Sequence, residues 1–471
     1  MTAGPSLDSL HWKSPVLTTS GKTILAAISV VIGLVVFWVM RSKTPVDSIR
    51  PVTELPETRQ IAPEEWIGIS SQGGLKGTGW VLLPAPSTEP PFHTDIDPAA
   101  RGFLAPQVCG ECHEQNYQSF LATTHARTSA EPGPDTILGS FEGEQSILKT
   151  GNPNFWFRMV AEDKRFYQEL HIRKNASEYV HRPPIDLVLG SGNHGQAYLY
   201  WEGDHLYQMH VSYLTELNRW VNSPGMYING TADFARPVPG RCLDCHATWF
   251  AEDRKSINRF DRHNYVLGVT CVRCHGPGHE HVNWHRQVPG ETEGKRIVNP
   301  ATLSRERMNE LCAQCHSAGE PNAPAFAYRP GEPLAEYLQL DFSADDPGNE
   351  DPHSANQLAR LMKSKCYSMS DSLTCISCHD PHRDQRKHPE EFSVSCLKCH
   401  TVEACEERKT LGSAIDNRCI DCHMPARRDA QVRMEMGQGS VSALIRDHHI
   451  GRWPEASEQI RSQILNSSEA Q

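Results

Sequence analysis

Apolar residues are distributed unevenly along the chain and predict an anchor followed by an extended segment. Residues 23–40 are eighteen uncharged, mostly apolar positions. As a helix rising ~1.5 Å per residue they would span about 27 Å, close to the hydrocarbon thickness of a bilayer. We therefore expect an uncleaved transmembrane helix at 23–40 after a cytoplasmic N-terminus at 1–22, with a cleaved signal peptide as the alternative. Nine prolines within 41–104 predict a spacer.

The middle of the chain carries strand-like patterns. Residues 167–172 alternate partially between apolar and polar, and 196–213 has the pattern of a hairpin turning at 202–204. These patterns predict a β-rich insertion at 131–240, whose aromatic residues are expected to form its core; a substrate platform remains the alternative. Further on, Ser304 is placed to cap a helix that runs to His316.

Length and charge exclude several classes of protein. The 471 residues exceed what one hydrophobic core usually serves, so more than one subregion is expected. The formal net charge is −11, and binding to nucleic acid needs clustered Lys and Arg. Nucleic acid is therefore not a predicted partner.

Fourteen of the sixteen cysteines fall into seven copies of Cys-x-x-Cys-His. Numbered as sites 1–7 in chain order, the copies are Cys109/Cys112/His113, Cys242/Cys245/His246, Cys271/Cys274/His275, Cys312/Cys315/His316, Cys375/Cys378/His379, Cys396/Cys399/His400 and Cys419/Cys422/His423. A histidine after every second cysteine cannot arise by chance at this composition.

This spacing suits covalent attachment of haem c. Two thiols three residues apart on one helical face can each add to a vinyl group, and the adjacent imidazole then binds the iron as proximal ligand. We predict seven covalently attached haems c. Four-cysteine zinc sites and thioredoxin-like dithiols are alternatives, but neither requires a His in every copy, and seven pairs leave a remainder.

The crowding of six sites into 241–453 predicts the fold class. Little room is left for a conventional core, so we expect a mainly α, loop-rich multihaem cytochrome, with short helices presenting the sites. The chain then divides into a site 1 segment at 105–130, the β-rich insertion between sites 1 and 2 at 131–240, a six-haem domain at 241–453 and a polar tail at 454–471.

Position along the chain selects candidates for the second, distal iron ligand. They are His125 after site 1, His279 after site 3, His382 after site 5 and His448, which can reach back to site 7. Weaker candidates, for which a solvated or core role is preferred, are His194, His210, His281, His285, His353 and His388. Cys366 and Cys405 remain; a disulfide, free thiols and an unusual sulfur ligand all stay open.

Haem c is attached on the outward face of a bacterial energy-transducing membrane. The sites therefore place everything after residue 40 outside. The expected location is the bacterial inner membrane, with a single span and the haem domain in the periplasm.

Several segments resemble the bacterial cytochrome c-552/c-554 domain family, whose haem packing is similar to that of hydroxylamine oxidoreductase. They include residues 184–195 (PIDLVLGSGNHG), 220–225, 271–279 (CVRCHGPGH), 365–382 and 419–425 (CIDCHMP), and the likeness covers roughly 105–453. The resemblance implies an exported multihaem electron carrier with His279 and His382 as distal ligands. The chain lacks the CxxCK site of the related pentahaem nitrite reductases and has one haem site fewer than the octahaem oxidoreductases.

Two functions follow. The preferred one is a membrane-anchored periplasmic electron carrier that connects a donor protein to an acceptor protein through mostly bis-His haems, with partners that present a basic face. The alternative is an oxidoreductase acting on a small nitrogen or sulfur compound at one five-coordinate haem.

Overall fold

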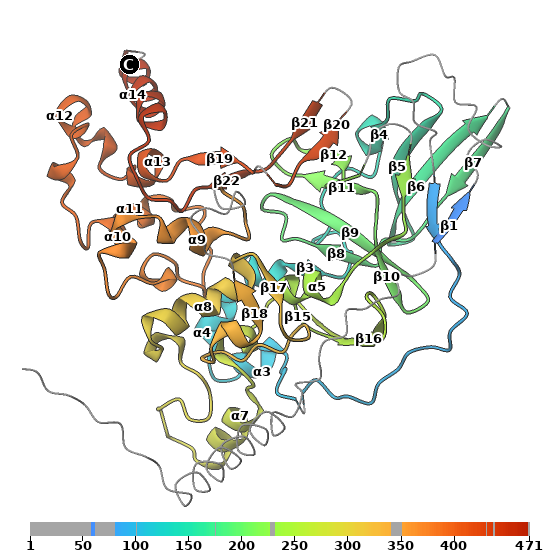
Figure 1. Cartoon of the computed structure of the whole chain (residues 1–471), viewed down its shortest axis with the longest axis horizontal. Helices are drawn as coiled ribbons and strands as arrows, with labels where there is room; N and C mark the ends of the chain where they lie inside the picture. The colour runs from blue at the N-terminus through green and yellow to red at the C-terminus, as the bar shows by residue number, and fades with distance from the viewer. Residues whose placement is uncertain are drawn as a thin grey trace, which may run out of the picture. The chain divides into compact units, whose positions relative to one another are not determined.

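The computed structural model in Figure 1 describes residues 58–61, 81–99, 101–174, 176–226, 231–340, 351–429, 431–436 and 439–469. These residues all belong to one unit, 52–471. The expected N-terminus and anchor, 1–40, and most of the expected spacer lie outside the described residues.

Strands dominate the chain between sites 1 and 2 (Figure 1). A four-stranded antiparallel sheet has the order β4–β5–β6–β7, and its longest pair joins β5 to β6 with Phe155 opposite Ile172. A seven-stranded sheet has the order β12–β11–β9–β10–β14, with β3 and β8 joined through β9. The strands are β3 (Ser129–Ala130), β4 (Ile147–Lys149), β5 (Phe155–Glu162), β6 (Arg165–Lys174), β7 (Ser177–His181), β8 (Leu187–Leu189), β9 (Gly195–Glu202), β10 (His205–Gln208), β11 (Val211–Leu214), β12 (Arg219–Asn222) and β14 (Arg236–Pro237).

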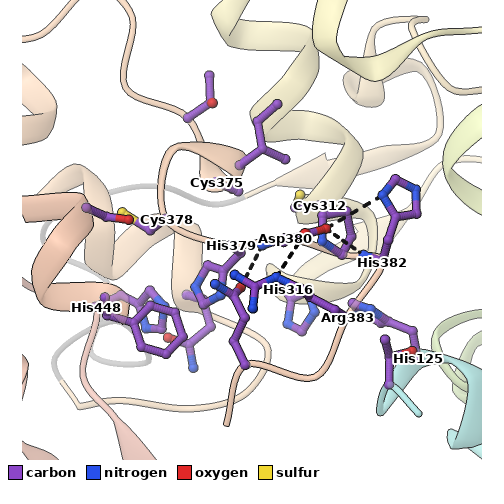
Figure 2. A pocket seen from close by; sticks show the side chains of 18 of the residues that line it. His125, Cys312, His316, Cys375, Cys378, His379, Asp380, His382, Arg383 and His448 are labelled. Atoms are coloured by element: carbon purple, nitrogen blue, oxygen red, sulfur yellow. Dashed lines mark hydrogen bonds and ion pairs between the residues drawn. The ribbon is translucent and has the colours of Figure 1, made fainter. Parts of the chain in front are cut away.

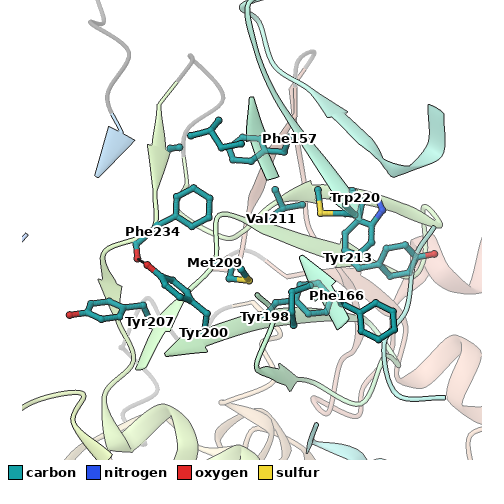
Figure 3. Close-up of a cluster of buried hydrophobic side chains, with 14 of the residues drawn as sticks. Phe157, Phe166, Tyr198, Tyr200, Tyr207, Met209, Val211, Tyr213, Trp220 and Phe234 are labelled. Atoms are coloured by element: carbon teal, nitrogen blue, oxygen red, sulfur yellow. Dashed lines mark hydrogen bonds between the residues drawn. The ribbon is translucent and has the colours of Figure 1, made fainter. Parts of the chain in front are cut away.

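The two sheets share an aromatic core, shown in Figure 3. Alternate residues of β5 are fully buried, whereas those between them are not, as expected for a sheet with one face turned inward. Edge-to-face contacts such as Phe141 against Trp220 and Tyr213 against Trp220 fill this core. Its members include Phe155, Phe157, Tyr198, Tyr200, Tyr207, Tyr213, Trp220 and Phe234. The aromatic residues of this segment therefore serve as packing.

The end of the expected spacer packs against this unit. A three-stranded sheet joins β1 (Thr58–Ile61), β2 (Val81–Pro84) and β13 (Ala232–Asp233), and Val81 is buried in the aromatic core. Further along, the Thr94 amide donates to Asp261 Oδ2 at 2.9 Å. Residues 81–99 are thus attached to the body.

The remaining chain consists of short helices and two-stranded sheets. The helices are α3 (Pro106–Gly110), α4 (Glu114–Leu121), α5 (Gly240–His246), α6 (Val272–His275), α7 (His279–Gln287), α8 (Arg305–His316), α9 (Gln357–Met362), α10 (Lys365–Ser368), α11 (Glu390–Cys396), α12 (Arg408–Leu411), α13 (Cys419–His423) and α14 (Pro454–Glu469). The sheets are β15–β16 (Ala247–Glu252 and Phe260–Leu267), β17–β18 (Gly319–Pro321 and Leu338–Leu340), β19–β22 (Ala426–Arg428 and Leu444–Arg446) and β20–β21 (Met434–Met436 and Gly439–Val441).

Single-turn 3-10 helices complete the described elements. They are η1 (His125–Arg127), η2 (Glu144–Ser146), η3 (Pro300–Thr302), η4 (Leu334–Glu336), η6 (Cys375–Ser377), η7 (Val402–Ala404) and η8 (Gly412–Ile415). The predicted cap of α8 is present, since Ser304 Oγ accepts a hydrogen bond from the Arg307 amide.

The expectation of a mainly α fold is wrong. Sheets occur inside the six-haem segment as well as in the insertion, and β15 is a clear case. Its residues Thr248, Trp249 and Phe250 are buried in succession, and β-branched and aromatic side chains of this kind favour strands. The chain therefore builds conventional apolar clusters around Val272 and Phe326 beside the cysteine motifs.

The expected membrane span also has to be corrected. Residues 23–40 lie outside the described residues, and none of the helices in the described ranges is long and apolar enough to cross a bilayer. The expected single-pass location in the inner membrane consequently has no structural support.

Truncating the aromatic core should destabilise the β-rich unit. Phe157 is fully buried against Phe155 and His210, so Phe157→Ala should lower the free energy of unfolding by about 3–5 kcal/mol. Val180→Ala is the matched control on β7, because Val180 is 43% exposed and should change stability by less than about 0.5 kcal/mol. Urea unfolding followed by circular dichroism compares the two, and equal effects would contradict this packing.

Candidate haem-binding cavity

Each motif forms about one helical turn. The backbone amide of the motif histidine donates to the carbonyl of the first cysteine in sites 1, 3, 5 and 6, at 2.9–3.0 Å. Sites 2, 4 and 7 end the helices α5, α8 and α13. Such a turn places both thiols on one side, with the imidazole beside them.

All seven motifs open into one cavity of about 3200 Å³. Every motif histidine lines it, as does every motif cysteine except Cys242. Ordinary ligand pockets hold about 300–1,000 Å³, so this space suits several large groups rather than one. Cys366 and Cys405 also line the cavity, and neither forms a disulfide.

Thiols from different motifs meet in pairs. Four hydrogen-bonded pairs connect site 1 to site 3, site 2 to site 4, site 4 to site 5, and site 6 to site 7; they are Cys109–Cys271, Cys245–Cys315, Cys312–Cys375 and Cys396–Cys419. The bond with Cys271 lowers the pKa of Cys109 to about 7, and the bond with Cys396 lowers that of Cys419 to about 6. Neighbouring attachment points are therefore in direct contact.

Four motif histidines face a second imidazole across the cavity. The distances between ring centres are 6.4 Å for His113–His281, 6.0 Å for His275–His382, 6.3 Å for His316–His125 and 6.1 Å for His379–His448. Figure 2 shows members of three of these pairs around Cys312, Cys375 and Cys378.

This spacing is the one that a shared metal ion requires. A coordinated nitrogen lies about 2.0 Å from the metal and about 1.1 Å from the centre of its own ring, so imidazoles on opposite sides of one ion have centres about 6.2 Å apart. Each of the four pairs therefore has the spacing at which two imidazoles could hold one haem iron between them.

Backbone carbonyls orient several of these rings. Nδ1 of His275 lies 3.0 Å from the carbonyl oxygen of Val298. Nδ1 of His281 lies 2.7 Å from that of Lys295, and Nδ1 of His448 lies 3.1 Å from that of Arg446. With Nδ1 donating its proton, Nε2 carries the lone pair that binds a metal. His316 and His423 have the same arrangement, with the carbonyls of Ser354 and Gly451.

Burial keeps the facing imidazoles neutral. It lowers the pKa of His125 to about 4, with a further contribution from His316, and it lowers the pKa of His448 to about 4, helped by His379. A neutral imidazole is the form that ligates iron. The donor types, spacing and protonation therefore fit covalent haem with two axial histidines.

The structure brings three of the four expected distal residues to a motif histidine. His125, which follows site 1, faces site 4, and His382, which follows site 5, faces site 3. His448 faces site 5 and not the expected site 7. His279 faces no motif histidine within the described part of the chain and contacts Asn283 Nδ2 through Nε2, at 2.9 Å.

His281, which sequence reasoning ranked low, takes the position expected of His279. Both lie on α7, but two residues rotate the helix by roughly 200°, so they point to different sides. Gly278, His281, Val282 and His285 line the cavity at helical spacing. This helical spacing in the sequence could have identified His281 as the residue facing the cavity. The distance in sequence from the Cys-x-x-Cys-His motif, on which His279 was chosen, could not.

The other three motif histidines are His246, His400 and His423. Among the described residues, no second imidazole faces any of them at this spacing. Burial lowers the pKa of His246, so this ring too is held neutral.

Comparison with known proteins agrees with this site. The family described as cytochrome c554 and c-prime matches residues 194–276. The chain is 20% identical over 386 residues to the dissimilatory sulfite reductase MccA of Wolinella succinogenes, covering 69% of this chain and 50% of that one. It is 25% identical over 170 residues to the multiheme cytochrome MtrA of Shewanella baltica, covering 34% of this chain and 44% of that one. The chain thus spans about half the length of the curated relatives it matches.

Among solved structures, the outer cell wall cytochrome OcwA matches with a TM-score of 0.47 and 18% identity, over 75% of this chain and 80% of that one. The recurrent Cys-x-x-Cys-His turns, the cavity they share and the cytochrome relatives lead to one conclusion. The chain is a multihaem c-type cytochrome with covalently bound haem c.

Proposed function

We propose that this cytochrome binds seven haems c and carries electrons along them between a donor protein and an acceptor protein. The observation that carries the proposal is the contact between motifs: each thiol pair brings two attachment points together. When bound, haem iron supplies a one-electron couple, and the protein supplies positioning, axial ligands and burial.

The contacts define an order for the sites. Cys274 and Cys312 pack in one apolar cluster, which connects site 3 to site 4. The ring of His379 contacts that of Phe392 on α11, the helix that carries Cys396, and this contact connects site 5 to site 6. The resulting series runs 1–3–4–5–6–7, with site 2 attached at site 4. Sites 1 and 7 therefore end the series and are the proposed points of exchange with partner proteins.

Axial ligation follows from the ring pairs. We assign His281 to site 1, His382 to site 3, His125 to site 4 and His448 to site 5, each opposite the motif histidine. Two imidazole ligands leave no open position at the iron, which suits transfer of electrons without binding of substrate. The net charge of −11 favours partners that present a basic face, and this steering should weaken as salt is added.

A second candidate function is the reduction or oxidation of a small sulfur or nitrogen compound. One observation favours it: His246, like His400 and His423, faces no second imidazole within the described residues, and site 2 alone lies on the branch from site 4. The Wolinella relative carries the name of a sulfite reductase. An iron with one protein ligand would leave a position for substrate.

The haem count is tested by intact mass after maturation in a host that attaches haem c. We expect the mass of the polypeptide plus seven haem groups, with a Soret band. Replacing Cys375 and Cys378 with Ala should remove one group, whereas replacing Cys366 and Cys405 should remove none. A mass that leaves any motif unmodified would contradict the count of seven.

The ligand assignment at site 1 is tested by two neighbouring variants. His281→Ala should convert one ferric haem from low spin to high spin, because it removes the imidazole 6.4 Å from His113. His279→Ala is the matched control on the same helix and should leave the spin state unchanged. Electron paramagnetic resonance compares the two variants. A high-spin signal in His279→Ala but not in His281→Ala would contradict the assignment of His281 to site 1.

Small-molecule binding separates the two functions. The carrier role predicts that sulfite, nitrite and hydroxylamine leave the ferric spectrum unchanged. The oxidoreductase would instead show a high-spin signal that shifts with one of these compounds. That signal should disappear when Cys242 and Cys245 are replaced with Ala, and its presence would favour the second candidate.

A further inference from the structure

The segment that presents His448 is held from behind by a buried ion pair. Asp447 is fully buried and Arg360 is 2% exposed. Arg360 donates from Nε to Oδ1 of Asp447 at 2.9 Å and from Nη2 to Oδ2 at 2.7 Å. The two parallel hydrogen bonds fix the carboxylate in both position and orientation.

Further contacts fix the backbone on each side of His448. The amide of His449 donates to Oδ1 of Asp447 at 2.9 Å. Ser364 Oγ donates to the carbonyl of His448 at 3.2 Å and accepts from the amide of Ile450 at 2.8 Å. The residues before and after His448 are therefore both hydrogen-bonded, and its ring has little freedom to move away from His379.

The ion pair ties this segment to the neighbouring haem site. Arg360 lies on α9, which contacts α8, and α8 carries Cys312, Cys315 and His316 of site 4. Site 4 in turn meets site 5 through Cys312 and Cys375. Arg360 thus connects the segment that carries His448 to α8, the helix that carries site 4.

Stability alone gives a weak reason for such a pair. Desolvation opposes the burial of two charges, and apolar residues of similar volume are often as stabilising. A bidentate pair does, however, fix a single geometry, and an axial ligand has to be held within about 0.5 Å of its place.

We propose that Arg360 and Asp447 are positioning residues that hold His448 opposite His379 as the distal ligand of the haem at site 5. This inference rests on the proposed function, because it requires a haem at Cys375 and Cys378 with His448 as its ligand. Neither residue binds the haem iron itself; both act through the backbone that carries His448.

The test uses the full haem-loaded protein and the double variant Arg360→Met with Asp447→Leu. Removing both charges avoids an unpaired buried ion. Arg427, which also donates to Asp447, keeps its ion pair with Asp351 at 2.6 Å. Electron paramagnetic resonance of the ferric protein should show one of seven haems converted to high spin, as in His448→Ala. Added imidazole should restore the low-spin signal in both variants.

The matched control replaces Arg259 with Met and Asp253 with Leu, a largely buried pair joined at 3.1 Å, neither of which lines the cavity. This control variant should have the same low-spin haems as the unmodified protein. If the Arg360/Asp447 variant does the same while His448→Ala becomes high spin, the positioning role is overturned. If His448→Ala itself stays low spin, the ligand assignment of the proposed function fails instead.

Should the double variant lose its circular dichroism spectrum, Asp447→Asn carries the test. It keeps the shape of the side chain but removes the charge that both arginines contact. A high-spin fraction reversed by imidazole supports the proposal, and an unchanged spectrum overturns it.

Discussion

Imidazole rings that face one another with centres 6.0–6.4 Å apart determine how the haem-binding cavity is organised. The gap matches the spacing of two imidazole ligands on one metal ion. Carbonyls hold Nδ1 of several of these rings, and burial holds His125 and His448 neutral. The position, orientation and protonation of these imidazoles thus all suit binding of haem iron.

The facing rings also connect distant parts of the chain. His281 follows site 3 but faces site 1, His382 follows site 5 but faces site 3, and His448 follows site 7 but faces site 5. His125 connects in the other direction, from the segment after site 1 to site 4. The short helices around the cavity therefore do not each form a separate haem unit. Each of the four motif histidines with a facing ring meets a segment that belongs to another site, so the proposed ligation requires the haem region to mature as a whole.

Sequence alone could predict what depends on neighbouring residues. The attachment motifs, the cap at Ser304 and the hairpin between β9 and β10 are local patterns, and the structure contains the last two as expected. The partner of each motif histidine could not be found in this way, because it depends on how separate segments fold together. His279 and His281 show the difference, since only the helical position of each decides which one faces His113. The mainly α expectation failed because it assumed that haem would replace the apolar core. Trp249 and Phe250 instead build one from strands.

An iron anomalous difference map from crystals of the mature protein would show whether the facing imidazoles share haem iron. Seven peaks are expected, one beside each motif histidine. Four of them should lie midway between the paired rings, about 3 Å from each ring centre, as expected for imidazoles bound about 2.0 Å from the metal. Peaks surrounded by cysteine sulfurs, or no peak between His379 and His448, would contradict it.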